Sequence, residues 1–324
     1  MTFVKTDPKS LRTRALAFLA FAPVFAWIGV TNWAAAATFQ TLDFPDAGGR
    51  TVPNDVSGAN VVGIYYDTRS SVSPFHGFLY NGSTWASLDD PLATVGTAAL
   101  GISGNTIVGY YAAGPLHGFI YDGTSYVTLD YPGALSTLAT GVDDGHIVGY
   151  SLDASNASHG FRYDNGSFAP IDFPGAGIFG TRPSAIWGDK IVGSFFDQDF
   201  QSHGFLFDGI NYVQLDVPAG SGTAAFGIWG NTIVGQYVGV DGYHHGYIYD
   251  GATYVTFDHP LAISVSFNHG IDGSTVVGGY DDLDGPADGF LTVVPEPPSH
   301  VLLTVAVVVL LVRRPSHRLQ RSTV

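Results

Sequence analysis

Short runs of alternating hydrophobic and polar residues recur along the chain, separated by turns rich in Asn, Gly and Asp. In one representative stretch the runs fall at Ala98–Ile102, Thr106–Tyr111, His117–Tyr121 and Tyr126–Tyr131. Every second residue within such a run lies on the same side, as in a β-strand with one face towards a core. No segment between residues 38 and 294 shows a helical period, so the pattern predicts an all-β fold.

The pattern returns six times at intervals of 40 to 46 residues, and three markers share this period. A Val-Gly pair marks the second run of each unit, with its glycine at Gly63, Gly109, Gly149, Gly193, Gly235 and Gly278. A His-Gly-aromatic triplet marks the third run, at His76, His117, His159, His203 and His245, with Asp288 in the sixth copy. An Asp-x-Pro signature ends the fourth run, at Asp43, Asp89, Asp130, Asp172, Asp216 and Asp258.

Four short strands in a repeat of this length match the size of one blade of a β-propeller. The last unit stops at Phe290–Val294 without a fourth strand, and a lone strand at Thr38–Phe44 precedes the first unit. Pairing these two segments would complete a sixth blade and leave no sheet edge exposed. We therefore predict a six-bladed β-propeller of four-stranded blades over residues 38–294, with the last blade closed by the N-terminal strand. A β-solenoid and a pair of β-sandwiches are the alternatives.

Residues 1–37 have the organisation of a secretory signal peptide. Four basic residues precede an apolar run at 15–30, and four alanines at 34–37 offer small residues for cleavage. Because basic residues before an apolar run stay in the cytoplasm, the rest of the chain is expected to be exported through the inner membrane. An uncleaved membrane anchor is the alternative.

Residues 295–324 form a separate tail with three parts in a fixed order. An apolar run at 301–312 would make a helix only about 18 Å long, which is short for a membrane span. A Pro-Glu-Pro motif precedes the run and an arginine pair follows it: Pro295, Glu296, Pro297, Arg313 and Arg314. This order resembles the PEP-CTERM sorting signal. The resemblance implies transient anchorage by a short transmembrane helix, removal of the tail by an exosortase-type membrane enzyme, and a bacterial cell-surface or extracellular location near exopolysaccharide.

The third marker of the repeat also resembles the HAF repeat of extracellular bacterial proteins. Examples are His76–Tyr80, His117–Tyr121 and His203–Phe207, with Gly where that motif has Ala. The resemblance implies an extracellular repeat protein and specifies no activity.

The charge of the repeat region is strongly negative. Residues 38–294 contain 26 Asp and no Glu against five basic residues, and the whole chain lacks Cys. Such a surface disfavours nucleic acid and anionic lipid, and it suits either divalent cations or plain solubility. The absence of Cys excludes disulfides, thiolate zinc sites and a thiol nucleophile.

Two Asp-rich turns are candidate calcium sites, because calcium takes six to eight oxygen ligands and tolerates flexible loops. They contain Asp197 and Asp199 in one turn, and Asp281, Asp282 and Asp284 in the other. Neither turn has the spacing of an EF-hand. Turn capping by short Asp side chains is the alternative.

The five histidines of the third marker could in principle form a ring of metal ligands. A histidine at the same point of every unit is explained more simply by the repeat itself, as a residue at the start of a strand that bonds a neighbouring Asp or carbonyl. Catalytic sites normally break symmetry, since their residues take different roles.

Two tryptophans depart from the repeat. Trp187 and Trp229 occupy the position of Ser57, Ser103, Asp143 and Asp272, before a turn between the first two strands. In a propeller they would lie on adjacent blades at one end, where exposed rings could stack on sugars or on an apolar protein patch. Local packing between blades is the alternative.

No phosphate loop, nucleophile elbow, dinucleotide fingerprint or zinc-protease motif is present. We therefore expect no enzyme and no required cofactor, but a structural or interaction module at the cell surface or in the exopolysaccharide matrix. A lectin-like carbohydrate-binding propeller is one alternative. A calcium-assisted polysaccharide hydrolase or lyase at one channel mouth is the other, and polar residues that break the symmetry there would favour it.

Overall fold

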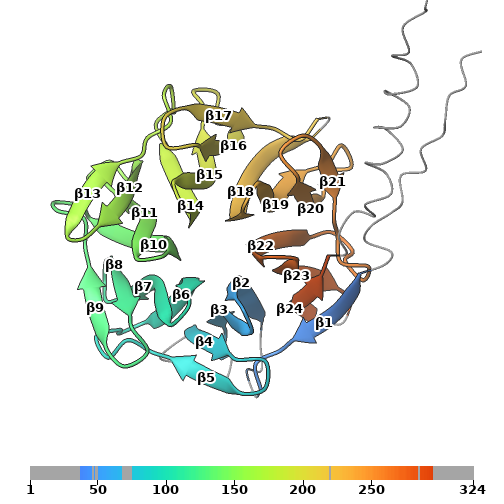
Figure 1. Ribbon diagram of the computed structural model, residues 1–324, viewed down its shortest axis with the longest axis horizontal. Helices are drawn as coiled ribbons and strands as arrows, with labels where there is room; N and C mark the ends of the chain where they lie inside the picture. The colour runs from blue at the N-terminus through green and yellow to red at the C-terminus, as the bar shows by residue number, and fades with distance from the viewer. Residues whose placement is uncertain are drawn as a thin grey trace, which may run out of the picture. The chain divides into compact units, whose positions relative to one another are not determined.

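The computed structural model describes residues 37–294, except 46, 48–49, 68–74, 219, 284 and the side chains of 285–287. The described residues form six antiparallel sheets of four strands each, arranged around a central axis (Figure 1). The protein is therefore an all-β, six-bladed propeller, as the period and the four strands per unit predict. The solenoid and sandwich alternatives are excluded.

Each blade runs from an innermost to an outermost strand in chain order, except the last. The first blade contains β2 (Thr51–Ser57), β3 (Asn60–Tyr65), β4 (His76–Tyr80) and β5 (Trp85–Leu88). The second and third contain β6 (Gly96–Ser103), β7 (Thr106–Ala112), β8 (Leu116–Tyr121), β9 (Tyr126–Leu129), β10 (Ser136–Asp143), β11 (His146–Leu152), β12 (Ser158–Asp164) and β13 (Ser167–Pro170). The fourth and fifth contain β14 (Thr181–Trp187), β15 (Lys190–Phe196), β16 (Ser202–Phe207), β17 (Tyr212–Leu215), β18 (Ser221–Trp229), β19 (Thr232–Val238), β20 (His244–Tyr249) and β21 (Tyr254–Thr256).

The sixth blade combines the two ends of the repeat region. It contains β22 (Ser266–Asp272), β23 (Thr275–Asp282), β24 (Gly285–Val293) and, as its outermost strand, β1 (Thr38–Leu42). The antiparallel register runs from Thr38 opposite Val293 to Leu42 opposite Gly289. The predicted closure by the N-terminal strand is therefore confirmed, and it pairs the edge of β24 that would otherwise be open.

The Val-Gly marker is a steric requirement of the second strand. A Cβ on Gly149 would lie 2.0 Å from the carbonyl oxygen of Leu138 and 2.8 Å from the ring of Phe161. The corresponding glycines of the other blades meet the same two groups at similar distances. Only glycine lets the first strand and the aromatic ring of the third strand approach this closely.

The other two markers build the core and fix the blade edge. The aromatic residue of each His-Gly-aromatic triplet is fully buried: Phe78, Phe119, Phe161, Phe205, Tyr247 and Phe290. In the five blades that have a triplet histidine, the Asp of the third marker lies beside it, as where His117 Nδ1 lies 2.8 Å from Asp130 Oδ2. This confirms the structural interpretation of the repeated histidines.

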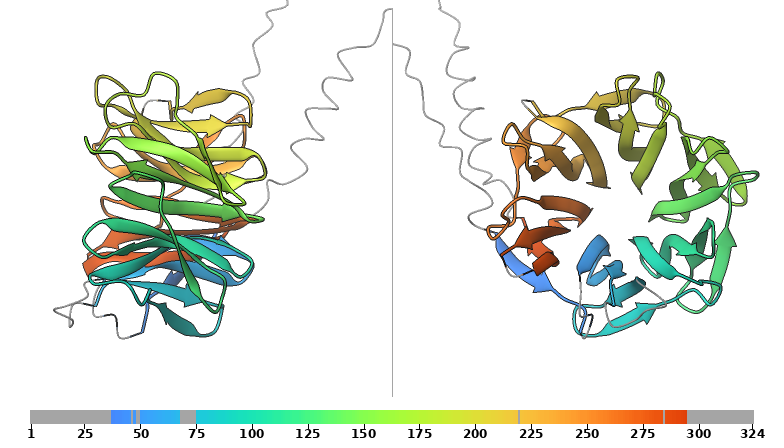
Figure 2. Two further views of the ribbon diagram at one scale, coloured as in Figure 1. Left: turned by 90° about the vertical axis from the view of Figure 1, so that its left-hand side faces the viewer. Right: turned by 180° about the vertical axis from the view of Figure 1, so that it is seen from behind.

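The core consists of apolar clusters between adjacent blades. One cluster joins Val62 and Leu88 of the first blade to Ile107 and Phe119 of the second. Another joins Leu42 of β1 and Val277 of the sixth blade to Phe78 of the first. Figure 2 shows the blades side by side around the axis, so each sheet packs face to face with the next. Burial therefore holds neighbouring blades together as well as each blade internally.

Several predictions lie outside the described residues. These are the signal peptide, the tail with its Pro-Glu-Pro motif and arginine pair, and Asp284. Within the described part of the chain, no helix has the length and apolar character needed to cross a membrane.

Candidate functional site

The six innermost strands line the ring axis, and each carries a β-bulge at the same point; β18 has a second register shift, between Ser221 and Ala224. In β10, for example, the register with β11 shifts between Ala139 and Gly141. At the residue after the bulge neighbouring blades nearly touch, since a Cβ on Gly141 would lie 2.8 Å from the Cα of Ala185. We call this ring of positions the neck: Asp55, Gly101, Gly141, Ala185, Gly227 and Gly270. Asp55 is the one polar side chain among these six positions.

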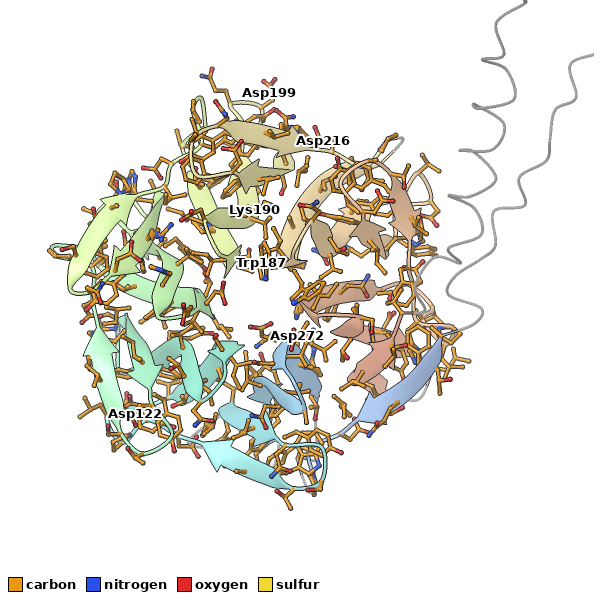
Figure 3. The ribbon with its side chains drawn as sticks, in the orientation of Figure 1. Asp122, Trp187, Lys190, Asp199, Asp216 and Asp272 are labelled. Atoms are coloured by element: carbon orange, nitrogen blue, oxygen red, sulfur yellow. The ribbon has the colours of Figure 1, made fainter. Side chains whose placement is uncertain are left out.

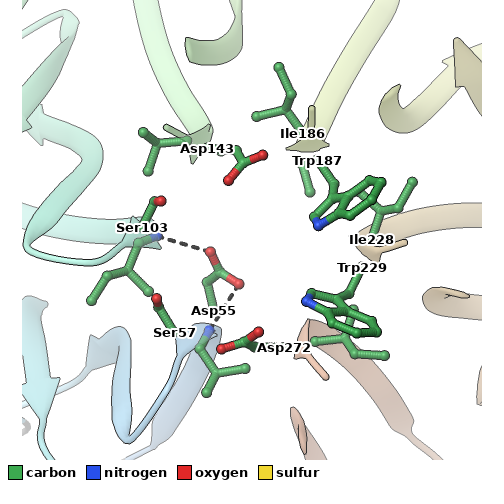
Figure 4. A pocket seen from close by; sticks show the side chains of 15 residues that line it. Asp55, Ser57, Ser103, Asp143, Ile186, Trp187, Ile228, Trp229 and Asp272 are labelled. Carbon is green, nitrogen blue, oxygen red and sulfur yellow. Dashed lines mark hydrogen bonds between the residues drawn. The ribbon is translucent and has the colours of Figure 1, made fainter. Parts of the chain in front are cut away.

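A hollow opens beyond the neck, at the C-terminal ends of the innermost strands (Figure 4). The last residue of each innermost strand surrounds it. We call these six residues the mouth ring: Ser57, Ser103, Asp143, Trp187, Trp229 and Asp272. Trp187 and Asp272 both lie near the axis (Figure 3).

Four members of the mouth ring have a clear structural role. Each accepts a hydrogen bond from a turn N–H of the next blade. Gly188 N donates to Asp143 at 2.7 Å and Gly58 N donates to Asp272 at 2.6 Å. Ser57 and Ser103 accept equivalent bonds at 3.2 and 3.4 Å. Wherever its side chain carries an oxygen acceptor, this position therefore forms a hydrogen bond between adjacent blades.

Trp187 and Trp229 cannot accept such a bond, because indole nitrogen is a donor only. The two residues are 39% and 43% exposed, and their ring centroids lie 6.5 Å apart at an interplanar angle of 55°. Lys190 partly replaces the inter-blade hydrogen bond that Trp187 cannot form. Its Nζ donates to the carbonyl of Gly230 at 3.1 Å and lies 5.5 Å from the Trp187 ring centroid. Two blades thus forgo a stabilising contact and present aromatic surface to solvent.

Asp55 extends from the neck into the same hollow (Figure 4). Its carboxylate accepts hydrogen bonds from the N–H groups of Val56 and Ile102, each at 2.9 Å. Burial raises the pKa of Asp55 to about 7 against the opposing effect of these two bonds, and the carboxylates of Asp272 and Asp143 raise it further. Asp55 therefore gains or loses its proton near neutral pH.

The mouth combines two kinds of recognition surface. The indole faces offer apolar area at one side, and Asp143, Asp272 and Asp55 offer carboxylate oxygens nearby. Carboxylates accept hydrogen bonds from hydroxyl groups, and bonds to charged acceptors are stronger than neutral ones. A flat molecule with an apolar face and several hydroxyl groups is complementary to this arrangement.

No protein-family model and no curated relative matches this chain. Among solved structures, a mutant of the Aleuria aurantia lectin in complex with Fucα1-6GlcNAc is similar, with a TM-score of 0.50 and 12% identity over 78% of this chain and 93% of that one. The SapL1 lectin in complex with alpha methyl fucoside has a TM-score of 0.49 and 16% identity, covering 76% and 97% of the two chains. A Trypanosoma rangeli sialidase in complex with sialic acid has a TM-score of 0.47 and 11% identity, covering 84% and 60%. At these identities the likeness shows the propeller fold alone.

The candidate calcium turns are engaged in other contacts. Asp197 Oδ1 accepts the N–H groups of Asp199 and Gln201, each at 2.8 Å, and its Oδ2 lies 3.2 Å from His203 Nε2. Asp281 accepts hydrogen bonds from the backbone and hydroxyl of Ser264.

Across the described part of the chain, no group of three or more His, Asp or Glu side chains comes together that could hold a metal ion. The structure therefore brings neither Asp197 with Asp199 nor Asp281 with Asp282 into a ligand set. Asp199 lies at the outer edge of its blade, away from the axis (Figure 3). The contacts of Asp197 and Asp281 are those of turn-capping residues.

The repeated histidines do not face the axis. Each belongs to the third strand of its blade, and His203 and His245 lie between two carboxylates, as where His245 contacts Asp258 at 2.7 Å and Asp241 at 3.1 Å. The ring of metal-binding histidines considered from the sequence is therefore not formed.

Sequence reasoning found the tryptophans but missed Asp55. A signal was present: aligning the six units by their Val-Gly pairs puts Asp55 at a position that is Gly or Ala in the other five. What the sequence could not show is that a bulge turns this residue into the channel, next to Asp143 and Asp272.

Proposed function

We propose that this protein is a non-enzymatic carbohydrate-binding propeller whose mouth ring holds a sugar unit of an extracellular polysaccharide. One observation carries the proposal. Trp187 and Trp229 replace residues that form hydrogen bonds between blades elsewhere in the ring, and both side chains remain exposed at the channel mouth. A change that gives up a stabilising contact and gains only exposed aromatic surface is explained by a ligand that covers that surface.

The chemistry of a sugar ring fits both halves of the mouth. One face of a pyranose presents C–H groups, which displace water from an indole face when the two stack. The hydroxyls at the edge of the ring can donate to Oδ1 of Asp143 and Asp272, because the turn N–H groups of the next blade donate to Oδ2 of each residue. The similarity in fold to the Aleuria aurantia lectin is compatible with this proposal.

The setting of the proposed function rests on the sequence. The signal peptide and the resemblance to the PEP-CTERM signal support export, transient anchorage and removal of the tail by an exosortase-type enzyme, which would leave the propeller at the cell surface or in the matrix. Exopolysaccharide or surface glycans would then be the available partners. The excess of aspartate disfavours nucleic acid as a partner.

Binding of neutral oligosaccharides to the full chain, followed by calorimetry and tryptophan fluorescence, tests the proposal. The variants Trp187→Ser and Trp229→Ser introduce the residue that blades one and two carry at the same position. Each variant is therefore expected to fold and to form the hydrogen bond to the next blade that serine forms in those two blades. We expect each to weaken binding about ten-fold or more, the size of losing one buried aromatic contact. Trp85 packs against Phe78 and Tyr80 inside its blade, so the double variant Trp187→Ser/Trp229→Ser, which keeps Trp85, serves as the fluorescence reference.

Binding that is unchanged in both variants would refute the proposed site. A variant that melts well below the native protein would instead show that the tryptophans stabilise the ring, which is the packing alternative.

A second candidate function uses the same mouth for polysaccharide hydrolysis. Asp55 breaks the symmetry of the repeat and lies there with Asp143 and Asp272, and a carboxyl with a pKa of about 7 is suited to donate a proton at neutral pH. Release of reducing ends from a bound polysaccharide, abolished in Asp55→Asn while binding persists, would establish this function. Binding without release in the native protein would exclude it for that substrate.

A further inference from the structure

A second cavity lies on the axis, on the other side of the neck from the mouth ring. Each innermost strand contributes its bulge residue to this cavity and its later residues to the mouth, so the two hollows face opposite ends of the channel. The second cavity has a volume of about 260 Å³, well above the roughly 30 Å³ share of one water molecule. None of the residues that line it is acidic, in a repeat region with 26 aspartates.

Arg182 is the charged residue of this cavity, and it departs from the repeat. Its counterparts in the other five blades are Val52, Ala98, Leu138, Ala224 and Phe267, which are all buried and apolar. A cation in place of an apolar side chain costs desolvation unless it meets an acceptor. Arg162, in contrast, pairs with Asp164 at 2.8 Å and Asp189 at 3.2 Å. Among the described residues, no carboxylate forms an ion pair with Arg182.

The guanidinium of Arg182 is held in place without a charged partner. Its Nε donates to the buried hydroxyl of Ser158 at 2.9 Å. Its Cζ lies 5.5 Å from the ring centroids of both Tyr150 and Phe196. The two terminal nitrogens donate no hydrogen bond to any described residue. An oriented guanidinium with two unused N–H pairs has the geometry that binds a carboxylate through two parallel hydrogen bonds.

Groups suited to hydroxyls line the same cavity as the arginine. Ser184 and Ser194 line the cavity, and Ser194 lies opposite Arg182 on the neighbouring strand. His269 Nδ1 donates to the carbonyl of Pro53 at 3.1 Å, which leaves Nε2 as an acceptor. Burial lowers the pKa of His269 to about 4, so the imidazole is neutral at physiological pH. The cavity thus offers a cation for one carboxylate and several neutral donors and acceptors around it.

We propose that this cavity binds an acidic sugar, with the carboxylate of a uronate unit on Arg182 and its hydroxyls on the surrounding polar groups. The site is separate from the mouth ring and does not depend on carbohydrate binding there. The two ends of one channel then differ in chemistry: carboxylates and indoles at one end, a single unpaired guanidinium at the other.

Titration of the full chain with glucuronate, glucose and acetate tests the proposal, because these probes separate the whole ligand from its ring and from its charge. We expect glucuronate to bind more tightly than either of the others. The variant Arg182→Leu places the residue of the third blade at this position and is expected to fold. It should weaken glucuronate binding about 10- to 100-fold, the usual effect of losing hydrogen bonds to a charged group. Arg182→Lys should give an intermediate loss, since lysine keeps the charge without the planar fork.

A measurement on the native protein avoids dependence on any variant. The Nε–H signal of Arg182 in an NMR spectrum should shift on addition of glucuronate and stay in place with glucose. Trp187→Ser and Trp229→Ser should leave glucuronate affinity unchanged, which distinguishes this site from the mouth ring. Equal affinity for acetate, or glucuronate binding that survives Arg182→Leu, would overturn the proposal.

Discussion

Replacing Asp55 with asparagine probes the neck, because the two side chains have nearly the same shape and only aspartate carries charge. Burial, assisted by Asp272 and Asp143, raises the pKa of Asp55 from 3.8 to about 7 in the folded protein. A carboxyl with a raised pKa binds its proton more tightly in the folded state than in the unfolded state. Its contribution to stability is therefore fully present below pH 3.8 and is lost as the pH rises through about 7.

The size of the effect follows from the pKa difference. Three pKa units at about 1.4 kcal/mol each correspond to roughly 4 kcal/mol. This is an upper value, because the half-buried side chain of Asp55 faces a hollow that water can enter. Near pH 4 the folded native protein and Asp55→Asn are both neutral at this position, but the amide has only one acceptor oxygen, so the variant loses one of the two backbone hydrogen bonds that Asp55 accepts and should be less stable by about 1–2 kcal/mol. Between pH 4 and pH 8 the stability difference should shift in favour of the variant by about 2–4 kcal/mol.

Urea unfolding at pH 4, 6 and 8, followed by circular dichroism, measures this difference, and the other carboxylates cancel because both proteins contain them. Asp122→Asn is a matched control with the opposite sign. Hydrogen bonds from Thr124 and Ser125 lower the pKa of Asp122, so its replacement should destabilise the protein at pH 8 and matter less as the pH falls. Parallel stability curves for the native protein and Asp55→Asn would refute the reasoning, since Asp55 would then ionise as an ordinary carboxyl.

Three further predictions concern the packing of one blade, the strand that closes the ring and the titration of two histidines. Gly149→Ala should destabilise the protein by about 3 kcal/mol or more in urea unfolding, because the added methyl meets a backbone carbonyl that cannot move aside; a loss below 1 kcal/mol would contradict this. Deleting Thr38–Leu42 should lower Tm and produce oligomers in size-exclusion chromatography, because the edge of β24 is exposed; a monomer with unchanged Tm would show that β1 is dispensable. Burial lowers the pKa of His203, but its bonds to Asp216 and Asp197 outweigh this effect, so in NMR titrations His203 should titrate above 6.5, and the stability it adds is lost as the pH rises through this raised pKa. His269 should stay neutral down to about pH 4, and titration of both rings near 6.5 would contradict the two assignments.

The fold could be predicted from the sequence because its markers report local packing rules that repeat. Glycine recurs where a carbonyl and an aromatic ring leave no room for a Cβ, and the aspartate of the third marker recurs because it contacts the triplet histidine. The strand Thr38–Leu42 was recognisable as the missing outermost strand because the last unit lacked one. These packing contacts form within one blade or between two neighbouring blades, so the residues that make them repeat in the sequence with the period of the blade.

The candidate site could not be predicted from the repeat period alone. Trp187 and Trp229 stood out because tryptophan is unlike the Ser or Asp of the other units. Asp55 did not stand out among 26 aspartates, since its importance comes from a bulge that directs it to the axis. Arg182 was equally hidden, because only the structure shows that its counterparts are buried and that no carboxylate pairs with it.

Four residues that break the symmetry of the ring lie on innermost strands, and each carries a cost in stability. Trp187 and Trp229 lack the hydrogen bond between blades that the equivalent residues form. Asp55 places a carboxyl where the other blades have Gly or Ala, and Arg182 places a cation where they have apolar side chains. All four lie on innermost strands, at the two ends of the channel. Random drift in a repeat protein would scatter such departures over exposed outer strands, where substitutions cost little. The costs borne at these four positions support the two binding sites proposed at the axis.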